Sequence, residues 1–170
     1  MPRLPLKDII DLANIILEQI RQLPSVTRAD LVGSVRRNKD TVKDIDIICS
    51  ATPNVFKQIK QLDTIKRIIS KSEDSAVIET IAGVCIDFRI IDPESYGAAL
   101  VFFSGSKEHN ILIRERGEER GLEINEYGVW KNQQWVAGTT EESVYAAIDS
   151  KFIPPEERLG PLPVADGRLP

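Results

Sequence analysis

The sequence predicts an α+β fold, in which a mixed or antiparallel sheet with flanking helices is followed by a small lobe of helices and a β-hairpin. An amphipathic helical pattern opens the chain, strand patterns dominate the next stretch, and helical periodicity returns after residue 92. The length of 170 residues suits one domain or two small lobes. We expect a sheet-rich part with its entry helix at 1–92, a second lobe at 93–153, and a proline-rich tail or linker at 154–170.

The first elements follow from local patterns in the chain. Residues 6–22 place isoleucine, leucine and alanine side chains on one helical stripe, and Pro24 ends that predicted helix. The apolar run at 29–34 breaks at a glycine, which indicates a strand that enters a turn. The polar stretch after it is expected to be a loop or a hairpin connection.

The middle of the chain carries the clearest strand signals. Residues 44–50 alternate charged with apolar side chains and then become wholly apolar, which is typical of a strand with one exposed end. Pro53 is suited to open a short helix. Three strand patterns at 64–91, separated by polar or glycine-containing breaks, predict hairpins.

The second lobe shows helical and turn signals. A small apolar run that ends at Gly105 predicts a short helix, and a charged amphipathic run at 107–120 predicts another, which stops at Gly121. The single histidine, His109, is expected on the surface of that second helix. Short strands follow, and a last helix begins after Thr140, whose side chain is a suitable N-cap.

The composition argues against several classes of protein. No apolar run approaches the roughly 20 residues that span a bilayer, and the N-terminus lacks the apolar core of a signal peptide, so we expect a cytoplasmic protein. Cys49 and Cys85 lie in apolar runs, which indicates that their thiols are buried and inert. Two cysteines and one histidine are also too few for a structural zinc site of the usual type. The net charge of −4 argues against tight duplex binding, although basic side chains can still cluster locally.

Three aspartates form the first part of a candidate site. Asp44 and Asp46 are two residues apart on a predicted strand, so their side chains point to the same face, where Asp87 from a neighbouring strand can join them. Such a cluster repels itself and raises its own pKa values unless divalent cations neutralise it. Mg²⁺ prefers oxygen ligands, and two such ions about 4 Å apart can activate a 3′-oxygen and stabilise a leaving pyrophosphate.

A Gly33-Ser34 turn, followed by Arg37, forms the second part. Glycine allows close approach of the backbone, whose N–H groups can hold phosphate oxygens together with the Ser34 hydroxyl and the Arg37 guanidinium. Taken alone, each motif has a commoner explanation, since most Asp-x-Asp pairs are exposed strand residues and most Gly-Ser pairs are plain turns. The ordered set of Gly-Ser, Asp-x-Asp and a later strand aspartate is far more specific.

This ordered set resembles the nucleotidyltransferase superfamily and, within it, the family X DNA polymerases, which include DNA polymerase beta. GSVRRNKDTVKDIDIICS is similar to the palm motif of that family, and IDFR to the strand that bears its third carboxylate. FFSGSKEHNILIR, GLEINEYGVW and TEESVYAAIDSKFIPPEER resemble its nucleotide-binding helix, its last lobe and its closing helix. The resemblance runs from about residue 3 to residue 158 and implies a nucleotidyltransferase palm.

The resemblance implies roles for individual residues. Asp44, Asp46 and Asp87 would be catalytic and bind two Mg²⁺ ions, with Mn²⁺ as an alternative, and Asp87 would also serve the primer 3′-oxygen. A larger set would bind the phosphates, the sugar and the minor-groove base edge of the incoming nucleotide. These nucleotide-binding residues are Arg3, Gly33, Ser34, Arg37, Phe102, Phe103, Gly105 and Asn110.

The same resemblance implies residues that meet DNA. Arg114 would contact the template strand, and Arg89 and Tyr127 would bind near the DNA and couple closure of the second lobe to the active site. Structural interpretations stay open for several of these residues. Phe102 and Phe103 are consistent with core side chains, Tyr127 with a partly buried one, and Arg114 with a solvated helix face.

The implied activity is transfer of a dNMP from a dNTP to a primer 3′-hydroxyl on primer–template or gapped DNA, in short-gap filling during repair. We expect a monomer without membrane attachment. We also expect it to be either associated with a bacterial or archaeal nucleoid or viral. Two alternatives stay open. The chain can be an untemplated or non-DNA nucleotidyltransferase, or a non-catalytic core that binds DNA ends.

Several departures from the family bear on these expectations. Phe102 lacks the hydroxyl of the tyrosine in DNA polymerase beta, which removes one possible hydrogen bond and bears on the strength of ribonucleotide exclusion, while a backbone carbonyl can still act as the sugar gate. Lys107 replaces an acidic residue near the base, and Val42 replaces a serine that contacts the phosphates. The helix-hairpin-helix, lyase and histidine-rich exonuclease segments are not found, so we expect no lyase activity and either a minimal enzyme or a piece of a longer one.

Overall fold

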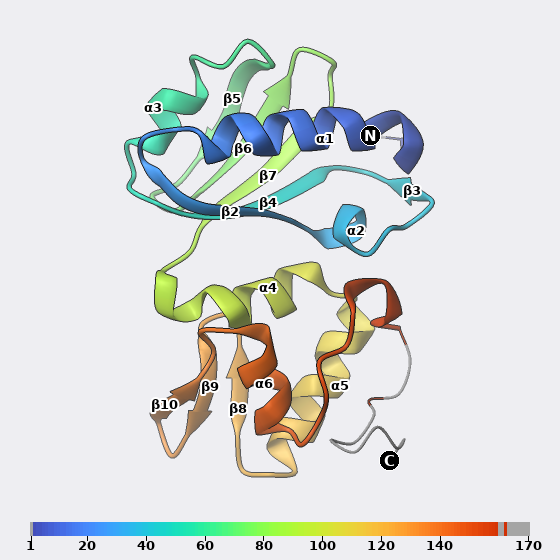
Figure 1. The fold of residues 1–170 in the computed structure, drawn as a ribbon, viewed down its shortest axis with the longest axis vertical. Helices are drawn as coiled ribbons and strands as arrows, with labels where there is room; N and C mark the ends of the chain where they lie inside the picture. Colours follow the sequence, from blue (N-terminus) through green and yellow to red (C-terminus); the bar gives the residue numbers. More distant parts are fainter. Residues whose placement is uncertain (1, 160–161, 163–170) are drawn as a thin grey trace. The chain divides into compact units, whose positions relative to one another are not determined.

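The computed structural model describes residues 2–159 and Leu162, and the chain forms two compact units, Met1–Ile91 and Asp92–Pro170 (Figure 1). Each unit combines helices with a sheet around a hydrophobic core of its own, which confirms the α+β class. None of the helices in the described part of the chain has the length and apolarity that crossing a membrane requires.

The first unit is built on a five-stranded sheet with the order β2-β4-β7-β6-β5. β4 and β7 run parallel and the other neighbouring pairs run antiparallel, so the sheet is mixed, as predicted. Its strands are β2 (Val26–Val32), β4 (Ile45–Ala51), β5 (Ile65–Lys71), β6 (Ser75–Thr80) and β7 (Cys85–Ile90).

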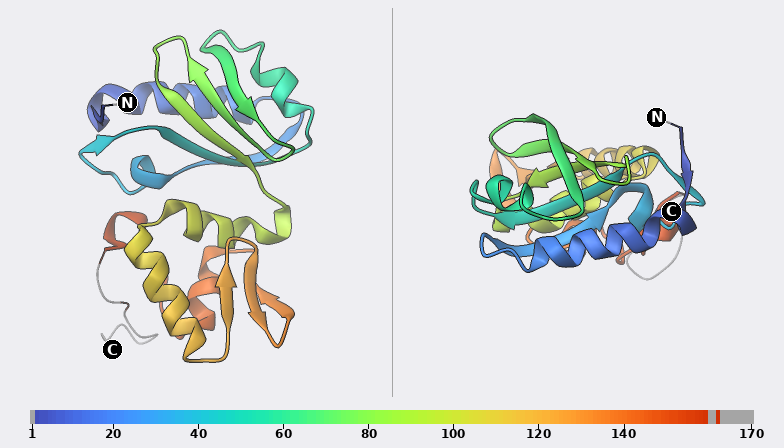
Figure 2. Two further views of the ribbon diagram at one scale, coloured as in Figure 1. Left: turned by 180° about the vertical axis from the view of Figure 1, so that it is seen from behind. Right: turned by 90° about the horizontal axis from the view of Figure 1, so that it is seen from above.

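Two helices, α1 (Leu6–Arg21) and α3 (Val55–Ile59), pack on one face of this sheet. The view from above in Figure 2 shows α1 lying along that face. Because side chains alternate along a strand, Ile45 and Ile47 of β4 point into the core under these helices, and Asp46 points to the opposite face. The buried side chains of α1 recur three or four positions apart: Ile9, Ala13, Ile16, Leu17 and Ile20.

The segment between β2 and β4 contains short elements where the sequence predicted a loop or hairpin. α2 (Gly33–Arg36) is one helical turn, and β3 (Thr41–Val42) pairs antiparallel with β1 (Leu4–Pro5). Arg3 reinforces this pairing, since its Nε donates to Thr41 Oγ1 at 2.9 Å and its Nη2 donates to the Thr41 carbonyl. The start of the chain is thereby tied to the segment that leads into β4.

The second unit combines helices with a three-stranded antiparallel sheet of order β10-β9-β8. Thr140 is an N-cap, as predicted, because its side chain accepts from Ser143 N at 3.1 Å; Ser106 caps α5 in the same way. The elements are η1 (Pro93–Ser95), α4 (Tyr96–Ser104), α5 (Lys107–Glu118), β8 (Glu123–Asn125), β9 (Gly128–Lys131), β10 (Gln134–Ala137), α6 (Glu141–Ala147) and η2 (Pro155–Glu157).

Some single residues differ from the sequence-based expectation. His109, expected on the surface, is 1% exposed, because it lies on the core side of α5 with its Nε2 2.9 Å from the Tyr145 hydroxyl. Tyr127, expected to be partly buried, is exposed. Cys49 is buried, as predicted, and burial raises the pKa of its thiol to about 12, whereas Cys85 is half-buried.

The predicted tail or linker at 154–170 begins as packed structure. Arg158 is fully buried, and its Nη2 donates to Glu141 Oε2 at 2.7 Å while its Nε donates to the Ile153 carbonyl at 2.9 Å. A buried guanidinium needs such partners, and they anchor this stretch to α6. Most of the tail beyond Leu159 lies outside the described residues.

Candidate active site

The parallel pairing of β4 with β7 places two of the predicted aspartates next to each other. The register joins Asp46 to Asp87, with Val32 on the other side of Asp46. Neighbouring strands lie roughly 4.8 Å apart, so two carboxylates that occupy one face at the same register are close neighbours. Both alternate with core residues of their strands, and therefore lie on the sheet face opposite α1 and α3.

Asp44 lies in a bend directly before β4, although the sequence predicted it on the strand itself. Its charge still acts on the carboxylate of Asp46. Burial, together with the negative charges of Asp87 and Asp44, raises the pKa of the Asp46 carboxyl to about 7 against the opposing effect of Arg37 and Arg89. The structure therefore brings the three predicted aspartates into one electrostatic cluster.

Gly33 makes room for the carboxylate of Asp46. Its backbone has a φ of +65°, and a Cβ built at this position would overlap Asp46 Oδ2 and stand 2.8 Å from Asp46 Cγ. Any side chain at residue 33 would displace the carboxylate as well as strain the backbone. The sequence linked this glycine to the approach of a phosphate. Its contact with Asp46 depends on the pairing of β2 with β4 and could not be derived from the motif.

Two arginines offset part of the negative charge of the cluster. Arg89 follows Asp87 by two residues on β7, and its Nη2 lies 3.9 Å from Asp87 Oδ2. Arg37 directly follows α2, and both guanidinium groups lower the pKa of Asp46. The resemblance implied that Arg89 meets DNA and couples lobe closure, and the structure places it beside a predicted metal ligand.

The predicted phosphate-binding turn is compact. Ser34 is half-buried within α2, and its carbonyl accepts from Lys39 N at 3.1 Å. Arg37 N donates to the Gly33 carbonyl at 3.1 Å, which closes the turn. Because Gly33 also contacts Asp46, this turn holds Ser34 and Arg37 at the same end of the sheet as the carboxylates.

The donor chemistry of this cluster fits a divalent cation. Among the described residues, no group of three or more His, Cys, Asp or Glu side chains is arranged closely enough to enclose a metal ion. The excess negative charge around Asp46 is nevertheless what a cation would neutralise. Mg²⁺ prefers carboxylate oxygens and usually completes its shell with water and substrate phosphates. Asp44, Asp46 and Asp87 therefore suit an ion that the substrate helps to hold.

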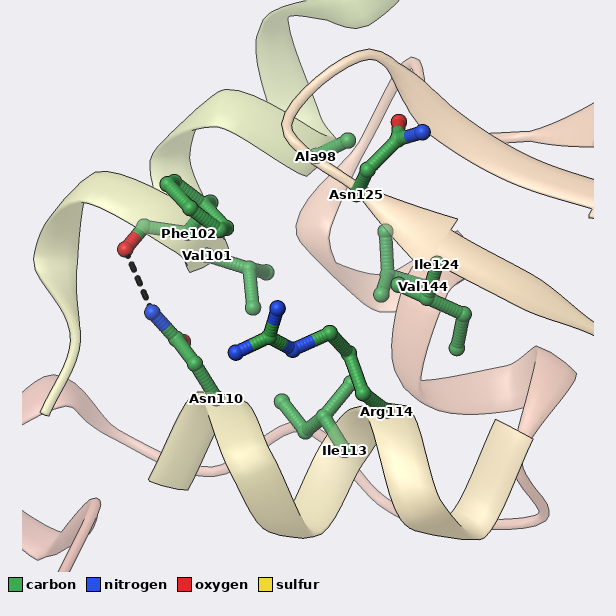
Figure 3. A pocket seen from close by; sticks show the side chains of 9 residues that line it. All are labelled: Ala98, Val101, Phe102, Asn110, Ile113, Arg114, Ile124, Asn125 and Val144. Carbon is green, nitrogen blue, oxygen red and sulfur yellow. Dashed lines mark hydrogen bonds between the residues drawn. The ribbon is translucent and has the colours of Figure 1, made fainter. Parts of the chain in front are cut away.

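In the second unit, predicted nucleotide-binding residues gather where α4 leads into α5. Phe102 and Phe103 lie half-buried in the last turn of α4, with their ring centroids 5.3 Å apart in a T-shaped arrangement. Gly105 follows with a φ of 67°, a conformation that favours glycine. Asn110 of α5 reaches back, and its Nδ2 donates to the Phe102 carbonyl at 2.7 Å (Figure 3).

A small pocket lies beside this hydrogen bond. Its volume of about 10 Å³ has room for about one water molecule, and its wall is mostly apolar. Figure 3 shows Arg114 extending from α5 into the same space as Asn110, with Phe102 on the α4 side. The structure thus brings together three residues to which the family resemblance assigns contacts with the base, the sugar and the template.

Tyr127 lies on the turn between β8 and β9, and its side chain is 58% exposed. The backbone of this turn is well held, because Asn125 Oδ1 accepts from Tyr127 N at 2.9 Å and the Tyr127 carbonyl accepts from Ser95 Oγ at 2.8 Å. The indole of Trp135 also donates to that carbonyl, at 3.2 Å. The structure therefore presents an exposed phenol on a fixed backbone.

Two family models match the chain: that of the DNA polymerase beta palm over residues 3–93 and that of the DNA polymerase beta thumb over residues 99–159. The chain is 34% identical over 162 residues to the DNA polymerase/3′-5′ exonuclease PolX of Bacillus subtilis, across 92% of the chain and 28% of the relative. It is also 26% identical over 73 residues to DNA polymerase IV of Saccharomyces cerevisiae, across 43% of the chain and 12% of the relative.

The chain therefore spans less than a third of the length of either curated relative. The palm match extends over more than half of the chain and coincides with the unit that carries the aspartate cluster, and the thumb match coincides with the unit that carries Asn110 and Arg114. The chain thus belongs to the family X DNA polymerases, with a palm and a thumb of the DNA polymerase beta type.

Proposed function

We propose that this chain carries out template-directed DNA synthesis, adding a dNMP from a dNTP to a primer 3′-hydroxyl in short gaps. The observation that carries the proposal is the pairing of Asp46 with Asp87 across β4 and β7, with Asp44 and Gly33 beside them. Membership in the family supports the same class of chemistry, since both curated relatives are named DNA polymerases.

The palm residues would position the reacting groups. Asp87, whose side chain is 43% exposed, would orient the primer 3′-hydroxyl, and Arg89 would hold that carboxylate in place. Ser34 and Arg37 would bind the β- and γ-phosphates of the dNTP, with Arg3 as a further phosphate contact. The 3′-hydroxyl would lose its proton to solvent, and its oxygen would form a bond to the α-phosphorus as the bond to the leaving pyrophosphate breaks.

The three aspartates would also hold the divalent cations of the reaction. Two bound Mg²⁺ ions, or Mn²⁺ in their place, would neutralise charge on the phosphates and favour ionisation of the 3′-hydroxyl. Asp44, Asp46 and Asp87 are suited to this because their negative charges already oppose one another without a cation. Phosphoryl transfer needs mainly such positioning and charge neutralisation.

The thumb residues would select the nucleotide and hold the template. Phe102, Phe103 and Gly105 would line the sugar, and Asn110 would meet the minor-groove edge of the base. Arg114 would contact the template strand, and Tyr127 would meet the DNA with its exposed ring. The contact of Asn110 with Phe102 supports a shared task for these residues.

Extension of a primer across a one-nucleotide gap tests this function. The protein is supplied with Mg²⁺ and each dNTP singly, beside an Asp44→Ala/Asp46→Ala variant and an Asp11→Ala control that removes an exposed carboxylate from α1. We expect extension with the complementary dNTP alone, lost in the double variant and kept in the control. Extension with any dNTP would instead indicate an untemplated transferase, and no extension by any form would contradict the proposal.

A further inference from the structure

The hydrogen bond from Asn110 to Phe102 ends on a carbonyl at the end of a helix. α4 ends at Ser104, so Phe102 lies in its last turn, where backbone carbonyls lose their helical partners. The side chain of Asn110 supplies a replacement partner from α5, with its Nδ2 2.7 Å from the Phe102 carbonyl oxygen (Figure 3). The position of this carbonyl is therefore set by a side chain eight residues further along the chain.

Both partners of this bond retain hydrogen-bonding capacity. A carbonyl oxygen accepts two hydrogen bonds and an amide nitrogen donates two, so one of each is left for a ligand. The amide nitrogen of Asn110 faces Phe102 because a carbonyl oxygen accepts only from a donor, and Asn110 Oδ1 is buried and accepts no hydrogen bond from the described residues. The phenyl ring of Phe102 has no polar atom, so its backbone carbonyl is the polar group that this residue can offer.

We propose that Asn110 is the positioning residue for the sugar gate, holding the Phe102 carbonyl against the sugar of the nucleotide while the same amide meets the base. The proposal rests on the polymerase function proposed above. A carbonyl held by a short hydrogen bond can accept from the 3′-hydroxyl of a dNTP and cannot retreat from an added 2′-hydroxyl. Loss of the Asn110 amide would free the carbonyl and relax selection against ribonucleotides.

The second N–H of the Asn110 amide explains why sugar and base selection would be coupled. It can donate to O2 of a pyrimidine or N3 of a purine, acceptors that the minor-groove edge presents in A·T and G·C pairs alike. This contact therefore checks the position of the base with little preference among bases. Arg114 lines the same pocket, so a base in that position would also meet the residue assigned to the template.

The test compares the sugars of three nucleotides that share one base. Incorporation of dCTP, CTP and ddCTP opposite a template guanine is measured as kcat/KM for the wild type, Asn110→Leu, Asn110→Gln and an Ile111→Ala control, whose side chain is exposed on the same helix. We expect Asn110→Leu to lower the ratio of dCTP to CTP roughly tenfold, the effect of one lost hydrogen bond. In the same variant, the difference in kcat/KM between dCTP and ddCTP should narrow. Asn110→Gln should restore part of both kcat/KM ratios, and Ile111→Ala should have the ratios of the wild type.

A binding measurement keeps the proposal separate from effects on turnover or folding. The dissociation constants of dCTP and CTP, measured with a primer that ends in a dideoxynucleotide, should converge in Asn110→Leu in the same proportion as the kcat/KM values. If Asn110→Leu does not fold, Asn110→Gln and Asn110→Ser supply the comparison. Equal losses for all three nucleotides, with unchanged ratios, would overturn the role at the sugar and leave the polymerase function intact. A wild-type protein that incorporates no nucleotide would overturn the polymerase function itself, and this inference with it.

Discussion

Asp46 is the residue at which fold stability and the proposed chemistry oppose each other. Its carboxyl is buried beside Asp87 and Asp44, and these effects raise its pKa to about 7. A group that resists ionisation in the folded state lowers the stability of that state when the pH forces it to ionise. Residues that a function requires commonly carry such a cost, and a bound cation would remove it.

Neutralising this residue should therefore stabilise the protein while it removes a metal ligand. We predict that Asp46→Asn raises the free energy of unfolding by about 1 kcal/mol or more at pH 8 without divalent cations, because it relieves buried like-charge repulsion. Thermal unfolding with and without Mg²⁺ measures this. Mg²⁺ should raise the melting temperature of the wild type and leave that of the variant unchanged. A less stable variant without Mg²⁺, or equal responses to Mg²⁺, would contradict the interpretation.

Gly33 and Gly83 form a matched pair for testing whether the Asp46 carboxylate needs the space that a glycine leaves beside it. Both have positive φ angles, +65° and +79°, but a Cβ at Gly83 would meet no atom within 4 Å, whereas one at Gly33 would overlap the Asp46 carboxylate. Alanine at either position costs about 1 kcal/mol of backbone strain. We predict that Gly33→Ala also lowers primer extension by roughly a hundredfold, while Gly83→Ala keeps activity near the wild-type level. Similar activities for the two variants would show that the glycine does not protect the carboxylate.

At the scale of elements, α5, α6 and η2 are joined by buried polar contacts instead of apolar ones alone. His109 of α5 contacts the hydroxyl of Tyr145 on α6, and Arg158, next to η2, pairs with Glu141 at the start of α6. The Arg158 guanidinium also lies 5.5 Å from the centroid of the Tyr145 ring. The burial of His109 and the charge of Arg158 lower the pKa of the imidazole to about 4.

This arrangement predicts a loss of thumb stability in mild acid. In the unfolded chain the histidine has the ordinary pKa of 6.5, so between pH 6.5 and about 4 the unfolded state binds more protons than the folded state. His109 therefore contributes a loss of up to about 1.4 kcal/mol per pH unit as the pH falls through that window. The free energies of unfolding of the wild type and of His109→Gln, measured between pH 7 and 4.5, should converge as the pH falls. Parallel curves would show that His109 does not titrate on unfolding.

The sequence predicted elements better than the contacts among them. Period-two alternation identified β4 and β7, and Thr140 indicated the start of α6, because these signals are local. The burial of Arg158 was missed because prolines at the end of the chain suggested a linker, whereas its partner Glu141 lies 17 residues away. His109 was missed for a similar reason, since the charged surface of α5 masks its contact with Tyr145.

The candidate site was also predicted only in part, because local signals identified its residues but not the contacts among them. Spacing alone indicated that Asp44 and Asp46 point to one sheet face, because alternation along strands is fixed by backbone geometry, but Asp44 lies in a bend directly before β4. The parallel register that pairs Asp46 with Asp87, and the place that Gly33 leaves for the carboxylate, depend on tertiary pairing. A local pattern predicts a strand but does not say which strands become neighbours in the sheet.

At the scale of the whole molecule, the chain combines a palm unit that carries the aspartates and a thumb unit that carries the pocket lined by Asn110 and Arg114. It spans 28% of the length of the Bacillus relative, so these two units are the part of that protein to which the comparison applies. The proposed division of labour assigns the chemistry to the palm and selection to the thumb. It follows that substitutions at the palm carboxylates should lower the incorporation rates of all nucleotides equally. Substitutions at Asn110 should instead alter the ratios of kcat/KM between nucleotides.

The single-turnover rate of primer extension by Asp87→Asn tests the central claim most directly. Asparagine keeps the size of the side chain and removes the charge, and Glu79→Gln is the matched control, because it neutralises a carboxylate on the adjacent strand β6 that pairs with Lys66 and Arg67 instead. We predict that Asp87→Asn slows extension by a hundredfold or more, roughly the loss of several kcal/mol of transition-state stabilisation, and that Glu79→Gln extends at nearly the wild-type rate. Extension by Asp87→Asn at the wild-type rate would contradict the assignment of the aspartate cluster as the catalytic centre.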